Sequence, residues 1–516
     1  MAAGRSYDAV ILAVALLRAG LGWHLGFRPF DDAFITFRYA LNIASGQGFV
    51  YNLNQPVLGT TTPLWTLILA LLNAVKLPLA GGSLALSLLA DAVTAILLGR
   101  TLRRLGYSHA VAGSASLLFL CFFDDLSLSR SGMETAFFVL LVAATLHEIA
   151  ARRFPSAGLF CGLACLTRPE GGVLILVLLL SLRQHRGRLR GRAAFLSIAL
   201  MLVSIIGWGL FAERVFGSFV PQSVVAKSFA VRTDPELARL SGRNLGLFFL
   251  QGQSGSQIFQ RTPWQLNSLL TFLSLAAFWR LSWDASRSAS GQNRERVLVL
   301  GLFPVCYVGG LALCHAFTWF PWYYGPIYPF YAILAAVGAS HLLEVLPCPS
   351  RVKAIFLPGL VATLLLGQFL TALLVKLPRD RSFWVTGYFQ AAGPIPRDPQ
   401  TTVAAFEIGV VGWRAWPATV IDVTGLVTPE AVGAPSDVLI ERLRPDYLVL
   451  KTDNAAAFLA RVQDEPWFVQ AYEPMLVIAD PYGDRRFCTY RLKPSRSRKK
   501  RPPASLPAAL RSCSKL

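Results

Sequence analysis

The feature that most constrains this chain is a series of apolar runs long enough to cross a lipid bilayer. A bilayer core about 30 Å thick is spanned by about 20 helical residues. Because 54% of the 516 residues are hydrophobic and only 15% are charged, an ordinary soluble domain is excluded. The runs occupy residues 7–26, 83–99, 109–123, 133–150, 193–212, 264–282, 297–316, 325–344 and 354–376.

Two shorter apolar runs complete the pattern. Residues 156–168 and 171–183 flank the sequence "TRPEGG", and we expect two truncated spans that meet there near one membrane face. The chain is therefore predicted to be an α-helical polytopic membrane protein with about eleven transmembrane helices. Residues 1–376 would form this membrane domain.

The basic residues predict how the helices are oriented. The net charge is +20, but the basic residues form short clusters between apolar runs, which is typical of membrane loops and not of a nucleic-acid partner. These clusters share one side, the cytoplasmic one by the positive-inside rule, if residues 63–82 form a juxtamembrane or re-entrant helix. The alternative is an ordinary spanning helix. We expect a multi-pass protein of the cell (inner) membrane, with large extracytoplasmic loops at residues 27–82 and 213–262.

The chain changes character after about residue 377. The runs "TTVAAFEIGVVGW", "ATVIDVTGLV" and "PDYLVLK" are β-like, and "APSDVLIERLR" is helical, so residues 377–494 are predicted to form a small extracytoplasmic α/β domain. Residues 495–516 are basic and rich in Pro and Ser, which is typical of a disordered tail that contacts anionic membrane lipids.

Two adjacent carboxylates, Asp31 and Asp32, follow the first apolar run. The apolar positions after them recur at helical spacing, and the sequence "SGQG" ends that pattern. In one interpretation, one aspartate caps this short helix and the other is solvated. In the other, one carboxylate at the membrane surface takes a proton from an acceptor hydroxyl that attacks a sugar carbon.

The candidates for binding a phosphate are cationic residues near the same membrane face. Arg168 of "TRPEGG" either pairs with Glu170 or binds phosphate oxygens with its fork of donors. Lys227 and Arg38 either contact phosphate or are solvated. Glu134 begins an outer helix, where an acid serves as a cap or contacts a ligand.

An aromatic segment, "FTWFPWYYGPIYPF", lies at an outer helix boundary. Its Trp322, Tyr323 and Tyr324 either belong to an interfacial aromatic belt or line a groove for an isoprenoid chain or a sugar face. The histidines and cysteines show no spacing typical of metal ligands, so no metal site is assigned.

Several of these motifs resemble those of C-type (GT-C) membrane glycosyltransferases, in particular the terminal arabinofuranosyltransferases of mycobacterial cell-wall assembly. The resemblance begins with "FDDAFITFRYALNIASGQGFVYNLNQPVLGTTTPLWTLILALL" and runs from about residue 30 to residue 450. It continues in order through "SGMET", "LTRPEG", "FVPQSVVAKS", "WYYGPIYPFYAIL", "EIGVVG" and "VIDVTGLV". Relatives commonly carry "GYTN" where this chain has "GTTT" at residues 59–62, which puts the sugar and the acceptor in doubt.

The resemblance implies a polyprenyl-phosphate sugar donor, with arabinofuranose as one candidate sugar, and transfer to an extracytoplasmic glycan, lipid or protein acceptor. The family's acidic motif falls on Asp31 and Asp32; we favour Asp31 as the base and Asp32 as a capping or metal-assisting residue. Family members differ in whether a divalent cation assists, so the resemblance implies no certain cofactor.

Two other functional classes fit a chain of many helices. A secondary transporter or lipid flippase would show paired half-repeats and charges near the middle of the membrane. A non-catalytic membrane protein of the same fold is the third alternative, since fold alone does not fix function. The conspicuous charges of this chain gather toward one face, which favours surface chemistry.

Overall fold

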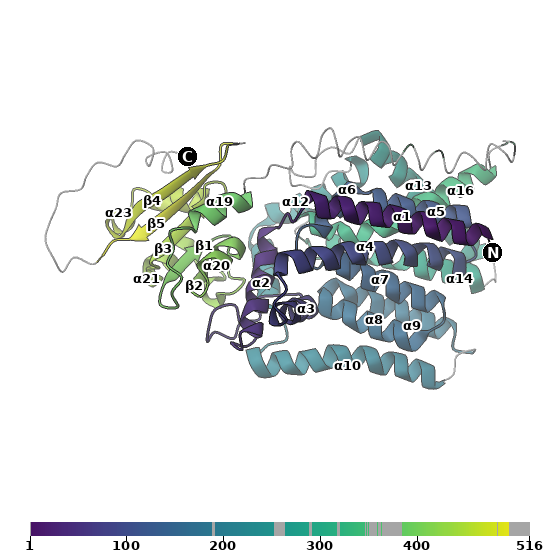
Figure 1. The fold of residues 1–516 in the computed structure, drawn as a ribbon, viewed down its shortest axis with the longest axis horizontal. Helices are drawn as coiled ribbons and strands as arrows, with labels where there is room; N and C mark the ends of the chain where they lie inside the picture. The colour runs from purple at the N-terminus through teal and green to yellow at the C-terminus, as the bar shows by residue number, and fades with distance from the viewer. Residues whose placement is uncertain are drawn as a thin grey trace.

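The computed structural model describes residues 2–187, 191–251, 264–287, 291–316, 320–345, 384–481 and 483–494, with isolated positions 347, 349, 359 and 363. A bundle of helices forms one end of the molecule and a small sheet domain forms the other, with α2 (Asp31–Ala44) standing between them (Figure 1). The predicted run 354–376 and the predicted tail 495–516 lie outside the described residues, apart from two isolated positions of the run.

Five helices in the described ranges are long and apolar enough to cross a membrane. They are Asp8–Leu25, Leu79–Arg104, Gly191–Phe216, Gly291–Leu313 and Pro321–Val345. The last of these runs through two short 3₁₀ turns, and the one before it through the π-helical turn η3 (Val297–Leu302). Side chains on α10 (Gly191–Phe216) are largely exposed, with Phe195 at 68% and Val203 at 70%, as expected of a face in contact with lipid.

The other helices of this domain are shorter or less apolar. The expected total of about eleven spans is therefore not confirmed, because several predicted runs form helices of 12 to 16 residues. The helices are α1 (Ala2–Leu25), α3 (Pro63–Ala74), α4 (Leu79–Arg104), α5 (His109–Cys121), α6 (Phe123–Ser129), α7 (Thr135–Ala150), α8 (Phe154–Thr167), η1 (Pro169–Gly172), α9 (Val173–Gln184), α11 (Gln222–Thr233), α12 (Pro235–Gln251), α13 (Trp264–Arg287), α14 (Gly291–Arg296), α15 (Phe303–Leu313), η4 (Pro321–Tyr323), η5 (Gly325–Ile327) and α16 (Tyr328–Val345).

Helix α3 is a short helix with one exposed apolar side. It begins at Pro63, whose fixed φ suits a first helical position, and ends before the left-handed Lys76. Its twelve residues are too few to cross a bilayer. Leu67 and Leu71 are exposed while Trp65 is fully buried. The predicted segment 63–82 is thus divided between α3 and the first residues of α4, and its assignment as a juxtamembrane or re-entrant helix stays a prediction.

The C-terminal domain contains a five-stranded sheet with the order β2-β1-β3-β5-β4. Strand β1 (Thr402–Ala405) pairs in parallel with β2 (Thr419–Asp422) and β3 (Tyr447–Lys451). Strand β5 (Arg486–Leu492) runs antiparallel between β3 and β4 (Tyr472–Ala479). The helices are α19 (Trp384–Ala391), α20 (Gly409–Ala415), η7 (Pro429–Ala431), α21 (Ser436–Leu443), α22 (Ala456–Val462) and α23 (Pro466–Ala471).

The sequence located three of these strands and one helix. Strands β1, β2 and β3 and helix α21 lie in the predicted runs. The segment "GVVGWRA" forms helix α20 and not part of a strand, because its amides are capped by a residue of α2, as described below. Strands β4 and β5 were not predicted.

Candidate functional site

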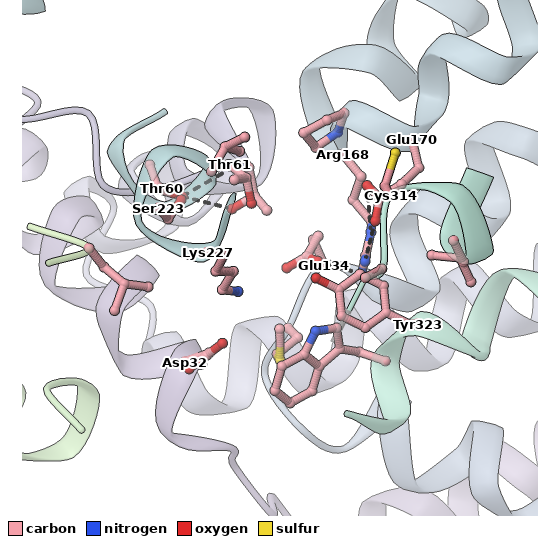
Figure 2. A pocket seen from close by; sticks show the side chains of 18 of the residues that line it. Asp32, Thr60, Thr61, Glu134, Arg168, Glu170, Ser223, Lys227, Cys314 and Tyr323 are labelled. Carbon is pink, nitrogen blue, oxygen red and sulfur yellow. Dashed lines mark hydrogen bonds and ion pairs between the residues drawn. The ribbon is translucent and has the colours of Figure 1, made fainter. Parts of the chain in front are cut away.

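A cavity of about 440 Å³ lies where α2 meets the ends of several membrane helices (Figure 2). Its volume is within the usual range of small-molecule sites. The wall combines charged, hydroxyl and apolar side chains. The lining residues are Asp32, Ile35, Thr36, Gly59, Thr60, Thr61, Thr62, Met133, Glu134, Arg168, Pro169, Glu170, Val173, Ser223, Val224, Lys227, Tyr307, Gly310, Leu311, Cys314, Ala316, Trp322, Tyr323 and Leu426.

The two adjacent aspartates have different surroundings. Asp32 lines the cavity, whereas Asp31 is not among its lining residues. The carboxylate of Asp31 instead accepts hydrogen bonds from the backbone N–H groups of Gly409 and Val410, both at 2.8 Å. Asp31 therefore caps the first turn of α20 from a helix almost 380 residues earlier in the chain.

We had favoured Asp31 as the base and Asp32 as the capping residue, and the contacts of the two side chains favour the reverse assignment. Neither aspartate caps α2 itself, because the N-cap position is Phe30 and no side chain bonds the first amides of the helix. Position 409 must be glycine, since a Cβ there would overlap the backbone oxygen of Asp31. Successive residues on a helix point about 100° apart, so one carboxylate faces the C-terminal domain while its neighbour faces the cavity.

Arg168 is the centre of a buried ion cluster on the wall of the cavity. It lies at the end of α8, where Pro169 stops the helix. Its guanidinium is 3.1 Å from Glu134 and 2.9 Å from Glu170. The ring of Tyr323 lies 5.4 Å from the guanidinium carbon. From the sequence, Arg168 was expected either to pair with Glu170 or to contact phosphate. The structure shows the ion pair with Glu170, and Arg168 also lines the cavity.

Lys227 and Asp32 face the cavity from different helices. Lys227 extends from α11 toward the space that Asp32 also borders (Figure 2). Burial raises the pKa of Asp32, although the charge of Lys227 opposes the rise. Burial disfavours the ammonium of Lys227, but Tyr323 and Asp32 outweigh it and raise its pKa. The cavity thus holds a more basic carboxylate than usual beside a persistent cation.

The part of the cavity wall formed by α9 and α15 is apolar. Val173 of α9 and Leu311 of α15 line it, together with Gly310 and the ring of Tyr307. Beyond this part, Leu313 at the end of α15 is 83% exposed. The cavity therefore joins an apolar part formed by α9 and α15 to the charged groups on its wall.

Two of the predicted ligand residues are held inside the protein. Arg38 is fully buried and donates to the backbone oxygens of Tyr51, Gly412 and Ala418, so it joins α2 to the C-terminal domain. Tyr324 is fully buried and stacks on Phe248 at 4.2 Å between ring centroids. Neither lines the cavity.

The structure brings seven of the ten predicted site residues to one cavity. They are Asp32, Glu134, Arg168, Glu170, Lys227, Trp322 and Tyr323. Other lining residues were not predicted from the sequence. They include the hydroxyl side chains at positions 60–62 and 223, Leu426, and the ring of Tyr307. The unusual "GTTT" sequence was the available signal for the first of these. Throughout the described ranges, no three His, Cys, Asp or Glu side chains gather as metal ligands.

Comparisons with known proteins find one match to the C-terminal domain and several solved structures of similar fold. A family model named "Domain of unknown function (DUF8728)" matches residues 390–491. No curated protein matches the sequence.

Among solved structures, ArnT from Cupriavidus metallidurans bound to undecaprenyl phosphate is similar, with a TM-score of 0.55 and 15% identity over 94% of this chain and 98% of that one. The apo state of that protein gives a TM-score of 0.54 with the same identity and coverage. The arabinosyltransferase EmbB from Mycobacterium smegmatis has a TM-score of 0.39 and 15% identity, over 86% of this chain and 42% of that one, and nothing about substrate follows from it. The chain therefore resembles GT-C proteins in fold, with the ArnT structures matching nearly its whole length.

Proposed function

We propose that this protein is a membrane glycosyltransferase that transfers a sugar from a polyprenyl-phosphate donor to a hydroxyl of a glycan, lipid or protein acceptor. The observation that carries the proposal is a single cavity with a carboxylate, two cations and an apolar wall. The fold supports the same class, because the similar ArnT structure holds undecaprenyl phosphate. The basic clusters of the sequence support a cell-membrane protein whose cavity and C-terminal domain face the extracytoplasmic side.

The charged and apolar parts of the cavity wall suggest how the donor lipid is oriented. Its phosphate lies against Arg168 and Lys227, which provide hydrogen-bond donors and positive charge. Its isoprenoid chain follows the apolar wall beside Tyr307 and Leu311. The two glutamates that hold Arg168 fix the direction of its guanidinium before any ligand arrives.

Asp32 is assigned as the general base. The acceptor oxygen forms a bond to the anomeric carbon while the bond from that carbon to the phosphate oxygen breaks. The proton of the acceptor hydroxyl moves to the carboxylate of Asp32, and the bonding electrons leave with polyprenyl phosphate. Arg168 and Lys227 stabilise the charge of this leaving group. A single displacement of this kind inverts the configuration at the anomeric carbon.

The test is transfer by the purified protein in lipid with a panel of polyprenyl-phosphate sugars. Asp32→Asn is expected to lower turnover by roughly 10²- to 10⁴-fold, the usual contribution of a positioned base. Asp464→Asn, at an exposed position of the C-terminal domain, is the matched control and should leave turnover unchanged. Full activity of Asp32→Asn would refute the assignment of the base, and no transfer with any donor would refute the reaction.

A further inference from the structure

Hydroxyl side chains gather on one wall of the cavity, away from Arg168. Thr60 and Thr61 and, from a different segment, Ser223 lie together there, with Arg168 and Glu170 on the other side (Figure 2). We call Thr60, Thr61, Thr62 and Ser223 the hydroxyl wall; all four line the cavity. Lys227, one turn after Ser223 on α11, lies between this wall and Asp32 in the view (Figure 2).

Ser223 is the part of the hydroxyl wall that points to a ligand. Its side chain is only 4% exposed, and its Oγ has no hydrogen-bond partner among the described residues. A buried hydroxyl without a partner is unfavourable. Of the buried side-chain atoms without a partner among the described residues, Ser223 Oγ is the one whose residue lines the cavity. By contrast, Thr60 and Thr62 already bond each other at 3.0 Å.

Three distant segments fix the position of this wall. The amide of Gln222 donates to the backbone oxygen of Leu58 at 2.7 Å, and its side chain donates to the backbone oxygen of Gly425 at 3.2 Å. Gly59 lies so close to the third segment that a Cβ would come within 2.8 Å of the Leu426 oxygen. The hydroxyl wall is therefore held by the C-terminal domain as well as by the membrane domain.

A carboxylate of the C-terminal domain shapes the segment that reaches the cavity. Asp422 ends β2, and its oxygens accept from the backbone N–H groups of Thr424, Leu426 and Val427. These bonds curl residues 422–427 into a compact turn that presents Leu426 to the cavity. The part of the chain matched by the family of unknown function thus supplies one lining residue of the cavity, Leu426, and a hydrogen bond that holds Gln222, the neighbour of Ser223.

The chemistry of the hydroxyl wall selects a class of ligand. The wall and its neighbours Gly59, Val224 and Leu426 carry no charge. The two glutamates of the cavity are paired with Arg168 on the far side. An ammonium group beside the hydroxyl wall would be repelled by Lys227, one turn after Ser223 on α11, and the remaining carboxylate of the cavity, Asp32, lies on the other side of Lys227 (Figure 2). Sugar hydroxyl groups, by contrast, would both donate to and accept from the threonine and serine oxygens.

We propose that the hydroxyl wall binds the ring of an uncharged sugar, with Ser223 as a specificity-determining residue that hydrogen-bonds one sugar hydroxyl. This inference rests on the proposed function, because it places the sugar of the donor whose phosphate lies at Arg168 and Lys227. A neutral pentose or hexose fits this wall, and an amino sugar does not.

The test compares binding of lipid phosphates with and without a sugar to the full-length protein in nanodiscs. The probes are decaprenyl phosphate alone and decaprenyl phosphate carrying arabinofuranose, mannose, glucose or glucosamine. At least one neutral sugar should increase affinity over the sugar-free lipid, and glucosamine should not. Ser223→Ala should weaken binding of that neutral donor by roughly three- to tenfold, the equivalent of one hydrogen bond, while leaving affinity for decaprenyl phosphate unchanged.

A control and a second variant separate the outcomes. Ser228→Ala changes an exposed serine of the same helix and should alter neither affinity. Leu426→Trp should exclude the glycosylated lipid and still admit the sugar-free one, because the larger ring fills the space at the hydroxyl wall. Equal losses for both lipids in Ser223→Ala, or tightest binding of the glucosamine donor, would overturn the inference.

The result also distinguishes this inference from the proposed function. If decaprenyl phosphate binds and Arg168→Met abolishes that binding, but no neutral sugar adds affinity, the hydroxyl wall alone is wrongly assigned. If no lipid phosphate binds the parent protein, the proposed function fails and the assignment of the hydroxyl wall fails with it.

Discussion

The membrane domain contains two clusters in which one arginine lies between two carboxylates, and they have opposite surroundings. Arg18 of α1 is 2.9 Å from Asp91 and 2.6 Å from Asp125, and it also donates to two backbone oxygens at the end of α5. None of these three side chains lines the cavity. Arg168, with Glu134 and Glu170, is equally well paired but borders the cavity.

The types of charged residue in a cluster therefore do not identify a functional site in this protein. Both arginines are nearly inaccessible, at 7% and 4% exposure, and a sequence-based search for buried charges would rank them together. What differs is the space beside them. The Arg18 cluster, which we call the sealed cluster, borders no part of the cavity, whereas the Arg168 cluster can add a ligand on its open side. Asp31 and Asp32 differ in the same way, because Asp31 bonds backbone amides of the protein whereas Asp32 borders the cavity.

The largest expected effect comes from breaking the sealed cluster. Arg18→Met leaves Asp91 and Asp125 buried without their counter-ion, so the free energy of unfolding should fall by about 3–5 kcal/mol. Thermal unfolding in detergent measures the loss. The triple variant Arg18→Met/Asp91→Leu/Asp125→Leu should regain most of it, because no unpaired charge remains. Turnover per folded molecule should be unchanged; a large loss of turnover at normal stability would mean that the sealed cluster takes part in the reaction.

The cavity-facing cluster should respond in turnover as well as in stability, because Arg168→Met also leaves Glu134 and Glu170 without their counter-ion. In the proposed reaction this change removes a preorganised donor for the leaving phosphate, and transfer per folded molecule should fall by roughly 10²- to 10³-fold. Arg168→Lys keeps the charge but loses the fork of donors and should recover only part of the rate. Steady-state kinetics with one donor lipid provides the measurement. If both variants transferred at the parental rate, the contrast between the two clusters would have no functional meaning.

A smaller effect is expected where Asp31 caps α20. Asp31→Ala removes the acceptors for Gly409 and Val410, which should destabilise the contact between the two domains by about 0.5–2 kcal/mol, as for other helix caps. Limited proteolysis of the C-terminal domain should become faster. The chemical step should be affected less than by Asp32→Asn, and an equal loss of turnover in the two variants would contradict the separate roles of the aspartates.

The smallest expected effect is a shift in the dependence of rate on pH. The proposed base, Asp32, would act when deprotonated, so activity should rise with pH through its pKa, which burial raises above the ordinary aspartate range. Lys227 opposes this rise, and Lys227→Met should therefore move the midpoint to higher pH. The profile of kcat/KM against pH gives both midpoints. A midpoint that moved downward would show that Lys227 does not act on the base.

Sequence reasoning located much of the fold because the signals there are local. Apolar runs, Pro63 and Pro169 mark helices and their ends, and short apolar runs separated by Pro and Gly mark β1 to β3. Seven of the predicted site residues line the cavity, and they could be selected from the sequence because their types carry charge or aromatic rings; that they bind a substrate stays a prediction. The cap formed by Asp31 could not be predicted, since its partners Gly409 and Val410 lie far away in sequence. The hydroxyl wall was missed for the same reason.

The contacts of Arg38 have a consequence for biosynthesis. Its guanidinium is satisfied by carbonyl groups that lie 374 and 380 residues later in the chain, and Leu426 reaches the cavity from the same late region. During translation, Arg38 therefore cannot make these contacts until residues 412 and 418 have been synthesised. The helices before them can insert into the bilayer earlier, but the cavity lacks one of its lining residues until Leu426 has joined it.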